Sequence, residues 1–276
     1  MINIMFCGND KVFDGMLTCT LSILKRTETK EPFTFYIYTV ELSHIKEQYL
    51  ALGKREADFL DSVVKRYNPE NRVVLIDVKE IYNKELAGCP NELSKYSPYA
   101  MLRVLADLVE GMPDKLLYLD SDIMFNRDAR LLYDIDIEEY EYAAARDHYG
   151  KYLIYPNYIN SGVLLLNLKK IKETGLLDKA RDALRKKALV FPDQSAIRIN
   201  TRKKKMLAQK FNDQKFLHKH TVVRHFSKRL FWLPYPHTEN IKQWHVEKVR
   251  KVFKYRQFDD ILDEYLNLME EYRRDL

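Results

Sequence analysis

The stretch Leu116-Leu117-Tyr118-Leu119-Asp120-Ser121-Asp122 ends an apolar segment with two carboxylates. Its first part predicts a short buried strand over residues 115–119, which Asp120 and Asp122 follow at once. Side chains two residues apart on an extended chain point the same way, and carboxylates held so close repel each other unless a cation lies between them. Because hard divalent cations prefer oxygen ligands, the stretch predicts a metal site at the end of a strand. The alternative is a polar loop with a capping aspartate.

The segments before this stretch alternate between strand-like and helix-like patterns. Apolar and β-branched runs predict strands over residues 2–7, 33–40, 72–78 and 115–119, and helical spacing predicts helices over residues 12–26, 43–67 and 97–109. We expect Ser43 to cap the second helix and Pro98 to open the third. Such alternation is typical of an α/β fold whose mostly parallel sheet carries helices on both faces. Ligands bind these sheets beyond the carboxyl ends of the strands, which directs attention to the residues after Cys7 and Leu119.

The second half of the chain has weaker patterns. Strands are predicted over residues 141–147, 162–168 and 221–226, a charged helix over residues 169–190, and two helices from residue 239 onward. The last helix is expected to bury one face, formed by Phe258, Ile261, Leu262, Tyr265, Leu266, Met269 and Tyr272. Neither an internal repeat nor a low-complexity linker interrupts the sequence, so we expect no second independent domain.

The composition is that of a globular protein and excludes several classes. The 276 residues include 46 Lys plus Arg against 40 Asp plus Glu, a net charge of +6. The eight glycines are too widely spaced to form a dinucleotide-binding, P-loop, kinase or α/β-hydrolase motif. Three cysteines without a Cys-x-x-Cys pair indicate a reducing compartment rather than a disulfide framework or a zinc site. Because we find neither a signal peptide nor an apolar run of about 18 residues, we expect a cytoplasmic protein.

The string Leu117-Tyr118-Leu119-Asp120-Ser121-Asp122-Ile123 resembles the Asp-x-Asp signature of glycosyltransferase family 8, a GT-A-fold group that includes glycogenin and bacterial lipopolysaccharide galactosyl- and glucosyltransferases. Further blocks are similar to this family in the same order: Phe6-Cys7-Gly8-Asn9-Asp10, Tyr99 to Arg103, Asp147, Tyr158 to Leu168, Phe191-Pro192-Asp193-Gln194 and His225-Phe226-Ser227. The resemblance implies a GT-A catalytic domain over residues 1–235, with a mixed, mostly parallel Rossmann-like sheet, and a helical extension over residues 236–276 packed on it.

The resemblance also implies a role for each matching residue. Asp120, Asp122 and His225 would hold the metal, and their oxygen and nitrogen donors suit Mn²⁺ or Mg²⁺. The residues implied to bind the donor are Cys7, Asn9, Asp10, Arg103, Ser121, Asp147 and Asn160. Gln194 and Asp193 would lie nearest the reacting carbon of the sugar.

One part of the chain departs from the family pattern. The family usually continues after the histidine with glycine, lysine, proline and tryptophan, whereas this chain reads Ser227-Lys228-Arg229-Leu230-Phe231-Trp232, without the glycine or the proline. We therefore expect Lys228 or Arg229 to take the role of the lysine that binds the donor's phosphates, and Trp232 to match the tryptophan.

The implied activity is transfer of a hexose, glucose or galactose, from a UDP-sugar to a glycan or lipid-linked acceptor with retention of the anomeric configuration. A metal ion and positive side chains would stabilise the charge on the leaving diphosphate. Retaining glycosidases use a carboxylate nucleophile, but the sequence places no carboxylate securely in that role. A front-side transfer, in which the leaving phosphate accepts the acceptor's proton, is the alternative.

Basic residues are concentrated in two parts of the chain. Residues 202–229 carry ten Lys plus Arg and one acid, which leaves the rest of the chain at −3. Residues 244–256 combine five basic residues with valines and Trp244, a pattern typical of a helix on an anionic membrane surface or of a solvated helix packed on a domain. We expect this C-terminal segment to make any peripheral contact with the inner face of the membrane.

Two other functions are consistent with parts of the sequence. A haloacid dehalogenase-like phosphatase would use Asp120 as nucleophile and Asp122 as acid, with Asp259 and Asp260 as a late acidic pair, but its motif normally lies near the N-terminus. A nucleic-acid-binding protein would use the basic residues 202–229. That function leaves the two carboxylates without a role, and we expect no nucleic-acid partner.

Overall fold

The central sheet forms from the apolar runs that the sequence marks as strands. The computed structural model describes residues 1–231 and 233–274. Its main sheet, within those ranges, has seven strands in the order β3-β2-β1-β4-β7-β6-β8. These strands are β1 (Ile2–Cys7), β2 (Phe33–Thr39), β3 (Arg72–Asp77), β4 (Lys115–Leu119), β6 (Tyr142–Ala145), β7 (Val163–Asn167) and β8 (Lys204–Leu207).

The sheet is mixed but mostly parallel, which confirms the predicted α/β architecture. Strand β1 is parallel to β2 and β4, β2 is parallel to β3, and β6 is parallel to β8, whereas β7 runs antiparallel to β4 and β6. Met5 is paired with Tyr118, so β1 and β4 end at the same edge of the sheet. Cys7 and Asp120 therefore come together at the edge where such sheets bind ligands.

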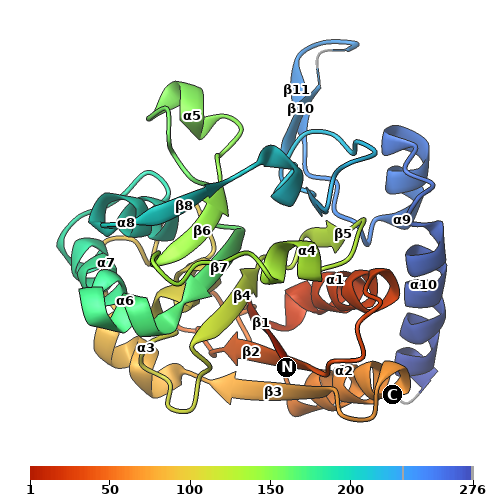
Figure 1. Cartoon of the computed structure of the whole chain (residues 1–276), viewed down its shortest axis with the longest axis horizontal. Helices are drawn as coiled ribbons and strands as arrows, with labels where there is room; N and C mark the ends of the chain where they lie inside the picture. Colours follow the sequence, from red (N-terminus) through yellow and green to blue (C-terminus); the bar gives the residue numbers. More distant parts are fainter. Residues whose placement is uncertain (232, 275–276) are drawn as a thin grey trace.

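Helices cover both faces of the sheet (Figure 1). One face packs against α1 (Phe13–Arg26), α2 (Lys54–Tyr67) and α10 (Asp259–Arg274), and the other against α3 (Lys79–Glu85), η2 (Pro98–Leu105), α6 (Leu168–Thr174), α7 (Leu176–Lys186) and α8 (Pro192–Asn200). The short elements are η1 (Asp10–Val12), α4 (Arg130–Tyr133), α5 (Gly150–Leu153), η3 (Gln209–Phe211), α9 (Val246–Lys248) and η4 (Val249–Phe253). In the part of the chain that the structure describes, no helix is long and apolar enough to cross a membrane.

The predicted helix over residues 43–67 is wrong in its first half, because only α2 is helical. Before α2 the chain folds back on itself, with the amide of Leu42 donating to the carbonyl oxygen of Tyr49 at 2.9 Å. Ser43 is not a cap, and its amide donates to the side chain of Glu41 at 2.8 Å. A local turn thus replaces the first turns of a helix whose apolar spacing looked continuous.

Two other predicted helices differ in form. The helix expected over residues 169–190 divides into α6 and α7 at Gly175, whose φ of +66° is the left-handed conformation that ends helices. The segment predicted to be helical over residues 97–109 is the 3₁₀ helix η2, which opens at Pro98 as expected.

The chain leaves the main sheet after β8. Strand β5 (Ile123–Phe125) pairs antiparallel with β9 (Val223–His225), and Ile123 lies opposite His225. The strand expected over residues 221–226 therefore exists as β9, but in a two-stranded ribbon. A hairpin of β10 (Arg229–Phe231) and β11 (His237–Glu239) follows and projects from the body of the molecule (Figure 1).

The C-terminal helix α10 packs against α1. Its buried residues include Ile261, Leu262, Tyr265 and Met269, as predicted. Leu266 contradicts the prediction, because it is 41% exposed while Leu268 is buried. Residues three and four apart share one face of a helix, so 261, 265 and 268 point inward and 266 is turned about 100° away from 265.

Candidate active site

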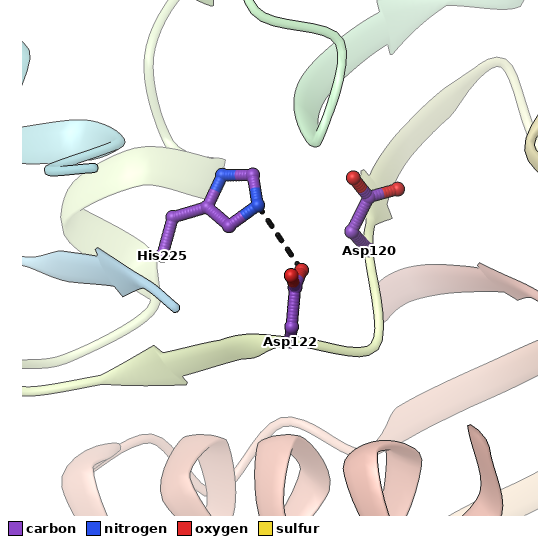
Figure 2. A group of neighbouring side chains, drawn as sticks. All are labelled: Asp120, Asp122 and His225. Atoms are coloured by element: carbon purple, nitrogen blue, oxygen red, sulfur yellow. Dashed lines mark ion pairs between the residues drawn. The ribbon is translucent and has the colours of Figure 1, made fainter. Parts of the chain in front are cut away.

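The three residues expected to bind a metal come together at the end of the sheet. Asp120 follows β4, Asp122 precedes β5, and His225 ends β9, with one ligand atom from each lying within 4.8 Å of the others. Figure 2 shows the imidazole directed at Asp122, where Nε2 lies 3.1 Å from the carboxylate oxygen Oδ1. The β5–β9 ribbon makes this possible, because it fixes His225 opposite the residue that follows Asp122.

Gly162 leaves the space that a cation would need between these side chains. A Cβ atom at this position would lie 2.5 Å from Cε1 of His225 and 2.6 Å from Oδ2 of Asp120. The carbonyl oxygen of Gly162 also accepts the amide of Asp120 at 2.8 Å, so its backbone is tied to the site. Two carboxylates and one imidazole around such a space are a donor set that suits Mn²⁺ or Mg²⁺.

A lysine from beyond the hairpin contacts the second aspartate. Nζ of Lys242 donates to Oδ2 of Asp122 and, at 3.1 Å, to the carbonyl oxygen of Phe226. Burial by itself raises the pKa of Asp122, but the charge of Lys242 and the contact with the His225 imidazole outweigh burial and hold this pKa well below its usual range. Asp122 is therefore an ionised carboxylate at neutral pH.

Arg103 holds the first aspartate from inside the protein. Its guanidinium is buried, donates to Oδ1 of Asp120 at 2.9 Å and to the carbonyl oxygen of Ser161, and lies 3.4 Å from Asp193. The hydroxyl of Tyr118 donates to the same Oδ1 at 2.6 Å. Burial lowers the pKa of Arg103, but the two aspartates raise it further, so the guanidinium keeps its charge.

A pocket of about 430 Å³ opens beside these residues. Its lining is Cys7, Gly8, Asn9, Val12, Ser97, Tyr99, Ala100, Arg103, Tyr118, Asp120, Ser121, Asp122, Asn240, Lys242, Trp244 and His245. Four of the residues expected to bind the donor, namely Cys7, Asn9, Arg103 and Ser121, are among them. Asp10 is not, and its side chain accepts the amide of Lys11. Burial raises the pKa of the Cys7 thiol, which is therefore neutral.

The residues expected on the sugar side form a hydrogen-bonded group next to this pocket. Asn160 donates to Asp147 at 2.9 Å. The amide of Ser161 donates to Gln194 at 2.9 Å, and its hydroxyl donates to Asp193 at 2.8 Å. The side-chain amide nitrogen Nε2 of Gln194 is buried and has no protein partner among the described residues.

Lys228 and Arg229 do not line the pocket. Arg229 lies in β10, with its guanidinium over the ring of Phe216 at 5.0 Å. Lys242 and Trp244 line the pocket instead, and sequence reasoning missed both of them. The signal was present, because Lys242-Gln243-Trp244 keeps a lysine and a tryptophan two residues apart, as in the expected lysine-proline-tryptophan order.

The hairpin of β10 and β11 explains why sequence spacing pointed to Lys228 and Arg229 rather than to Lys242. It separates His225 from Lys242, and Lys228 and Arg229, which follow the histidine closely, are not among the residues that line the pocket. Trp232, expected to match the tryptophan, lies outside the described residues.

The residues that the alternative functions need are engaged elsewhere. On α10, Asp259 bonds to Arg250 at 2.8 Å, and Asp260 bonds to Arg26 at 2.8 Å. Arg224, one of the basic residues in 202–229, is completely buried. Arg224 is therefore not available to a nucleic acid.

Comparisons with known proteins agree with this geometry. The family model described as Glycosyl transferase family 8 matches residues 3–229. A Haemophilus influenzae protein named as a glycosyltransferase is 26% identical over 236 residues, which are 76% of this chain and 63% of that protein. The chain therefore spans just under two thirds of this relative's length.

Two solved structures share the fold. The apo structure of the bifunctional glycosyltransferase WbbM has a TM-score of 0.72 at 16% identity, over 99% of this chain and 51% of that chain. The galactosyltransferase LgtC, in complex with donor and acceptor sugar analogs, has a TM-score of 0.66 at 18% identity over the whole of both chains. These likenesses confirm the predicted GT-A fold. With the family model matching most of its length, the chain belongs to glycosyltransferase family 8.

Proposed function

We propose that this chain transfers a hexose, glucose or galactose, from a UDP-sugar to a glycan or lipid-linked acceptor, with a divalent cation. The observation that carries the proposal is the cluster of Asp120, Asp122 and His225, which adjoins a pocket lined by Arg103 and Lys242. Bound there, Mn²⁺ or Mg²⁺ would stabilise negative charge on the leaving diphosphate. The positive side chains of Arg103 and Lys242 would stabilise the same negative charge.

The protein residues divide the donor among them. Cys7 and Asn9, at the end of β1, face the part of the pocket that we assign to the base, with Asp10 beside them. Lys242 takes the diphosphate role that the sequence suggested for Lys228 or Arg229. We assign the sugar to the neighbouring group of Asp147, Asn160, Asp193 and Gln194, where Nε2 of Gln194 is a donor without a protein partner among the described residues.

For retention of configuration we favour front-side transfer, in which the leaving phosphate accepts the acceptor's proton. A carboxylate nucleophile needs an exposed oxygen beside the reacting carbon. Asp193 is buried, accepts the Ser161 hydroxyl and lies beside Arg103. These partners occupy its carboxylate, which supports a positioning role for Asp193 and leaves Gln194 as the group nearer the sugar.

We further propose that residues 1–235 act as the catalytic domain and residues 236–276 as a helical extension that also supplies Lys242. For the acceptor we propose the exposed apolar segment after Asp147, where Tyr152 and Leu153 of α5 are 77% and 80% exposed. Peripheral contact with an anionic membrane through residues 244–256 has weaker support, because Arg250 is already paired with Asp259 and Asp263.

The deciding experiment is thermal unfolding with UDP-glucose, UDP-galactose or a GDP-sugar, each with and without Mn²⁺. We expect a UDP-sugar together with Mn²⁺ to raise Tm by about 5–10 °C at about 100 times Kd, and the GDP-sugar to raise it much less. Absence of any stabilisation that needs both UDP-sugar and metal would count against the proposal. Phosphate-ester hydrolysis without a sugar acceptor would favour the phosphatase, and steeply salt-dependent RNA or DNA binding would favour a nucleic-acid binder.

A further inference from the structure

Asn212 lies between the metal cluster and the sugar side, and none of the roles above uses it. It follows η3 and is completely buried. Its side-chain oxygen Oδ1 lies 3.1 Å from Nδ1 of His225, and its side-chain nitrogen Nδ2 donates to Oδ1 of Asn160 at 2.8 Å. A hydrogen-bonded chain therefore runs from His225 through Asn212 and Asn160 to Asp147.

The direction of every hydrogen bond in this chain is fixed from its far end. The backbone amide of Gly162 can only donate, and it donates to Oδ1 of Asn160 at 3.0 Å. The Asp147 carboxylate accepts from Nδ2 of the same asparagine. The Asn160 amide thus cannot be reversed without placing two acceptors or two donors against each other. Since its Oδ1 also faces Asn212, the group that Asn212 presents there must be its NH₂.

The orientation of Asn212 then determines the proton on His225. With its NH₂ turned to Asn160, Asn212 presents its oxygen to Nδ1, and an amide oxygen can only accept. Nδ1 must therefore carry hydrogen. The other ring nitrogen, Nε2, is the one directed at Asp122 (Figure 2), 3.1 Å from its carboxylate oxygen, so it is the nitrogen through which His225 would bind a metal held by Asp122.

The backbone around Asn212 is held as firmly as its side chain. Side-chain amides of Gln209 and Gln214 donate to the Asn212 carbonyl oxygen at 2.6 Å and 3.4 Å. Gln214 also donates to the carbonyl oxygen of Arg146 and accepts the amide of His148, so the segment is tied to the loop that carries Asp147. The two connections from Asn212 to this loop are independent of each other.

We propose that Asn212 is a positioning residue that fixes the Nδ1-protonated tautomer of His225 and joins the metal ligands to the sugar-side residues in one unit. The metal part of this inference rests on the proposed function. Partners of this kind, bonded to the second nitrogen of a metal-binding histidine, typically contribute about 10–100-fold to metal affinity.

The test uses the whole chain with Asn212→Ala, and Asn71→Ala as the matched control. Asn71 is equally buried, and its side chain bonds to the backbone of Phe33 and Val64, far from the cluster in the fold. Mn²⁺ affinity is measured by electron paramagnetic resonance. The His225 tautomer is read from ¹⁵N chemical shifts with and without Mg²⁺.

We expect Nδ1–H in the wild type and in the Asn71 control, an altered tautomer in Asn212→Ala, and an Mn²⁺ affinity about 10–100-fold weaker in that variant alone. Asn212→Asp keeps an acceptor and should keep the Nδ1–H form. An Nε2–H wild type, or unchanged Mn²⁺ affinity in Asn212→Ala, overturns the inference. If the wild type binds no Mn²⁺, the metal part of the proposed function fails. The tautomer of His225 in the wild type still decides the role of Asn212 in that case. It also decides that role if neither Asn212 variant folds.

Discussion

The candidate site has two walls that are stabilised in different ways. The sheet wall, residues 103–122 and 160–163, is held by strand pairing, since Leu119 lies opposite Val163 in the ladder of β4 and β7. The outer wall, residues 209–231 and 233–246, touches the site mainly through side chains and the short β5–β9 ribbon. A strand can be predicted from the pattern of residues that are adjacent in the sequence. Side-chain contacts between distant segments depend instead on how the whole chain folds.

Each wall also contains a buried arginine, and the two arginines differ. Arg103 on the sheet wall faces Asp120 and Asp193. Within residues 1–231 and 233–274, no carboxylate is bonded to Arg224 on the outer wall; its guanidinium lies 5.0 Å from the ring centre of Phe226 and donates to backbone carbonyl oxygens. Burial lowers the pKa of Arg224. The sheet wall is organised around charge, and the outer wall around aromatic packing.

Asp122 belongs to the sheet wall but contacts both His225 and Lys242 of the outer wall, so its replacement should break the site most severely. We expect Asp122→Asn to lower metal-dependent UDP-sugar turnover by about 10²–10³-fold, because a neutral amide neither balances the cations nor binds the metal well. Steady-state donor hydrolysis measures the loss. Asp178→Asn, on the exposed surface of α7, is the control, and full activity in Asp122→Asn would remove the metal assignment.

Two leucines of helix α10 allow a comparison of how much buried and exposed side chains contribute to the free energy of unfolding. Leu262 is completely buried, so Leu262→Ala should cost about 2–5 kcal/mol of unfolding free energy, measured with urea. Leu266 on the same helix is 41% exposed, and Leu266→Ala should change stability by less than about 0.5 kcal/mol. Equal effects at the two positions would contradict the observed orientation of the helix.

Lys242 separates the roles of the two lysine positions. A charge-assisted hydrogen bond contributes about 1.5–3 kcal/mol, so Lys242→Ala should raise the donor KM roughly 10–100-fold. Lys228→Ala should change it less than about threefold, since Lys228 does not line the pocket. A large increase in KM in Lys228→Ala and a small one in Lys242→Ala would return the phosphate role to Lys228, which precedes the hairpin.

The smallest effect is expected where α1 meets α10 through an ion pair. The hydrogen bond from Arg26 lowers the pKa of Asp260, so folding favours its ionised form. The resulting stability is present above the unfolded pKa of about 3.9 and is lost as the pH falls through the lower folded value. Because Asp260 is half exposed, Asp260→Asn should cost under about 1 kcal/mol at pH 7 and nothing near pH 2, in urea titrations at both pH values. A cost that persists in acid would point to lost packing.

The sequence predicts the residues of the sheet wall better than those of the outer wall. Asp120 and Asp122 were found because an apolar run and the two carboxylates after it are adjacent in the chain. His225 needed the family resemblance, since the strand pattern over residues 221–226 predicts β9 but does not show which distant residues its histidine contacts. Lys242 was missed because eleven hairpin residues, 229–239, interrupt the expected spacing. Asn212 acts through a hydrogen bond to a residue 13 positions away, for which no spacing rule exists.

The hairpin that interrupts the outer wall is also a place where the chain could be shortened or replaced. Arg229 and Glu239 lie opposite each other, so the chain enters and leaves the hairpin about 5 Å apart. A tight turn of a few residues could bridge that gap without displacing His225 or Lys242. The hairpin is therefore a natural position for loop exchange, where foreign segments could be grafted beside the site while both walls keep their own attachments.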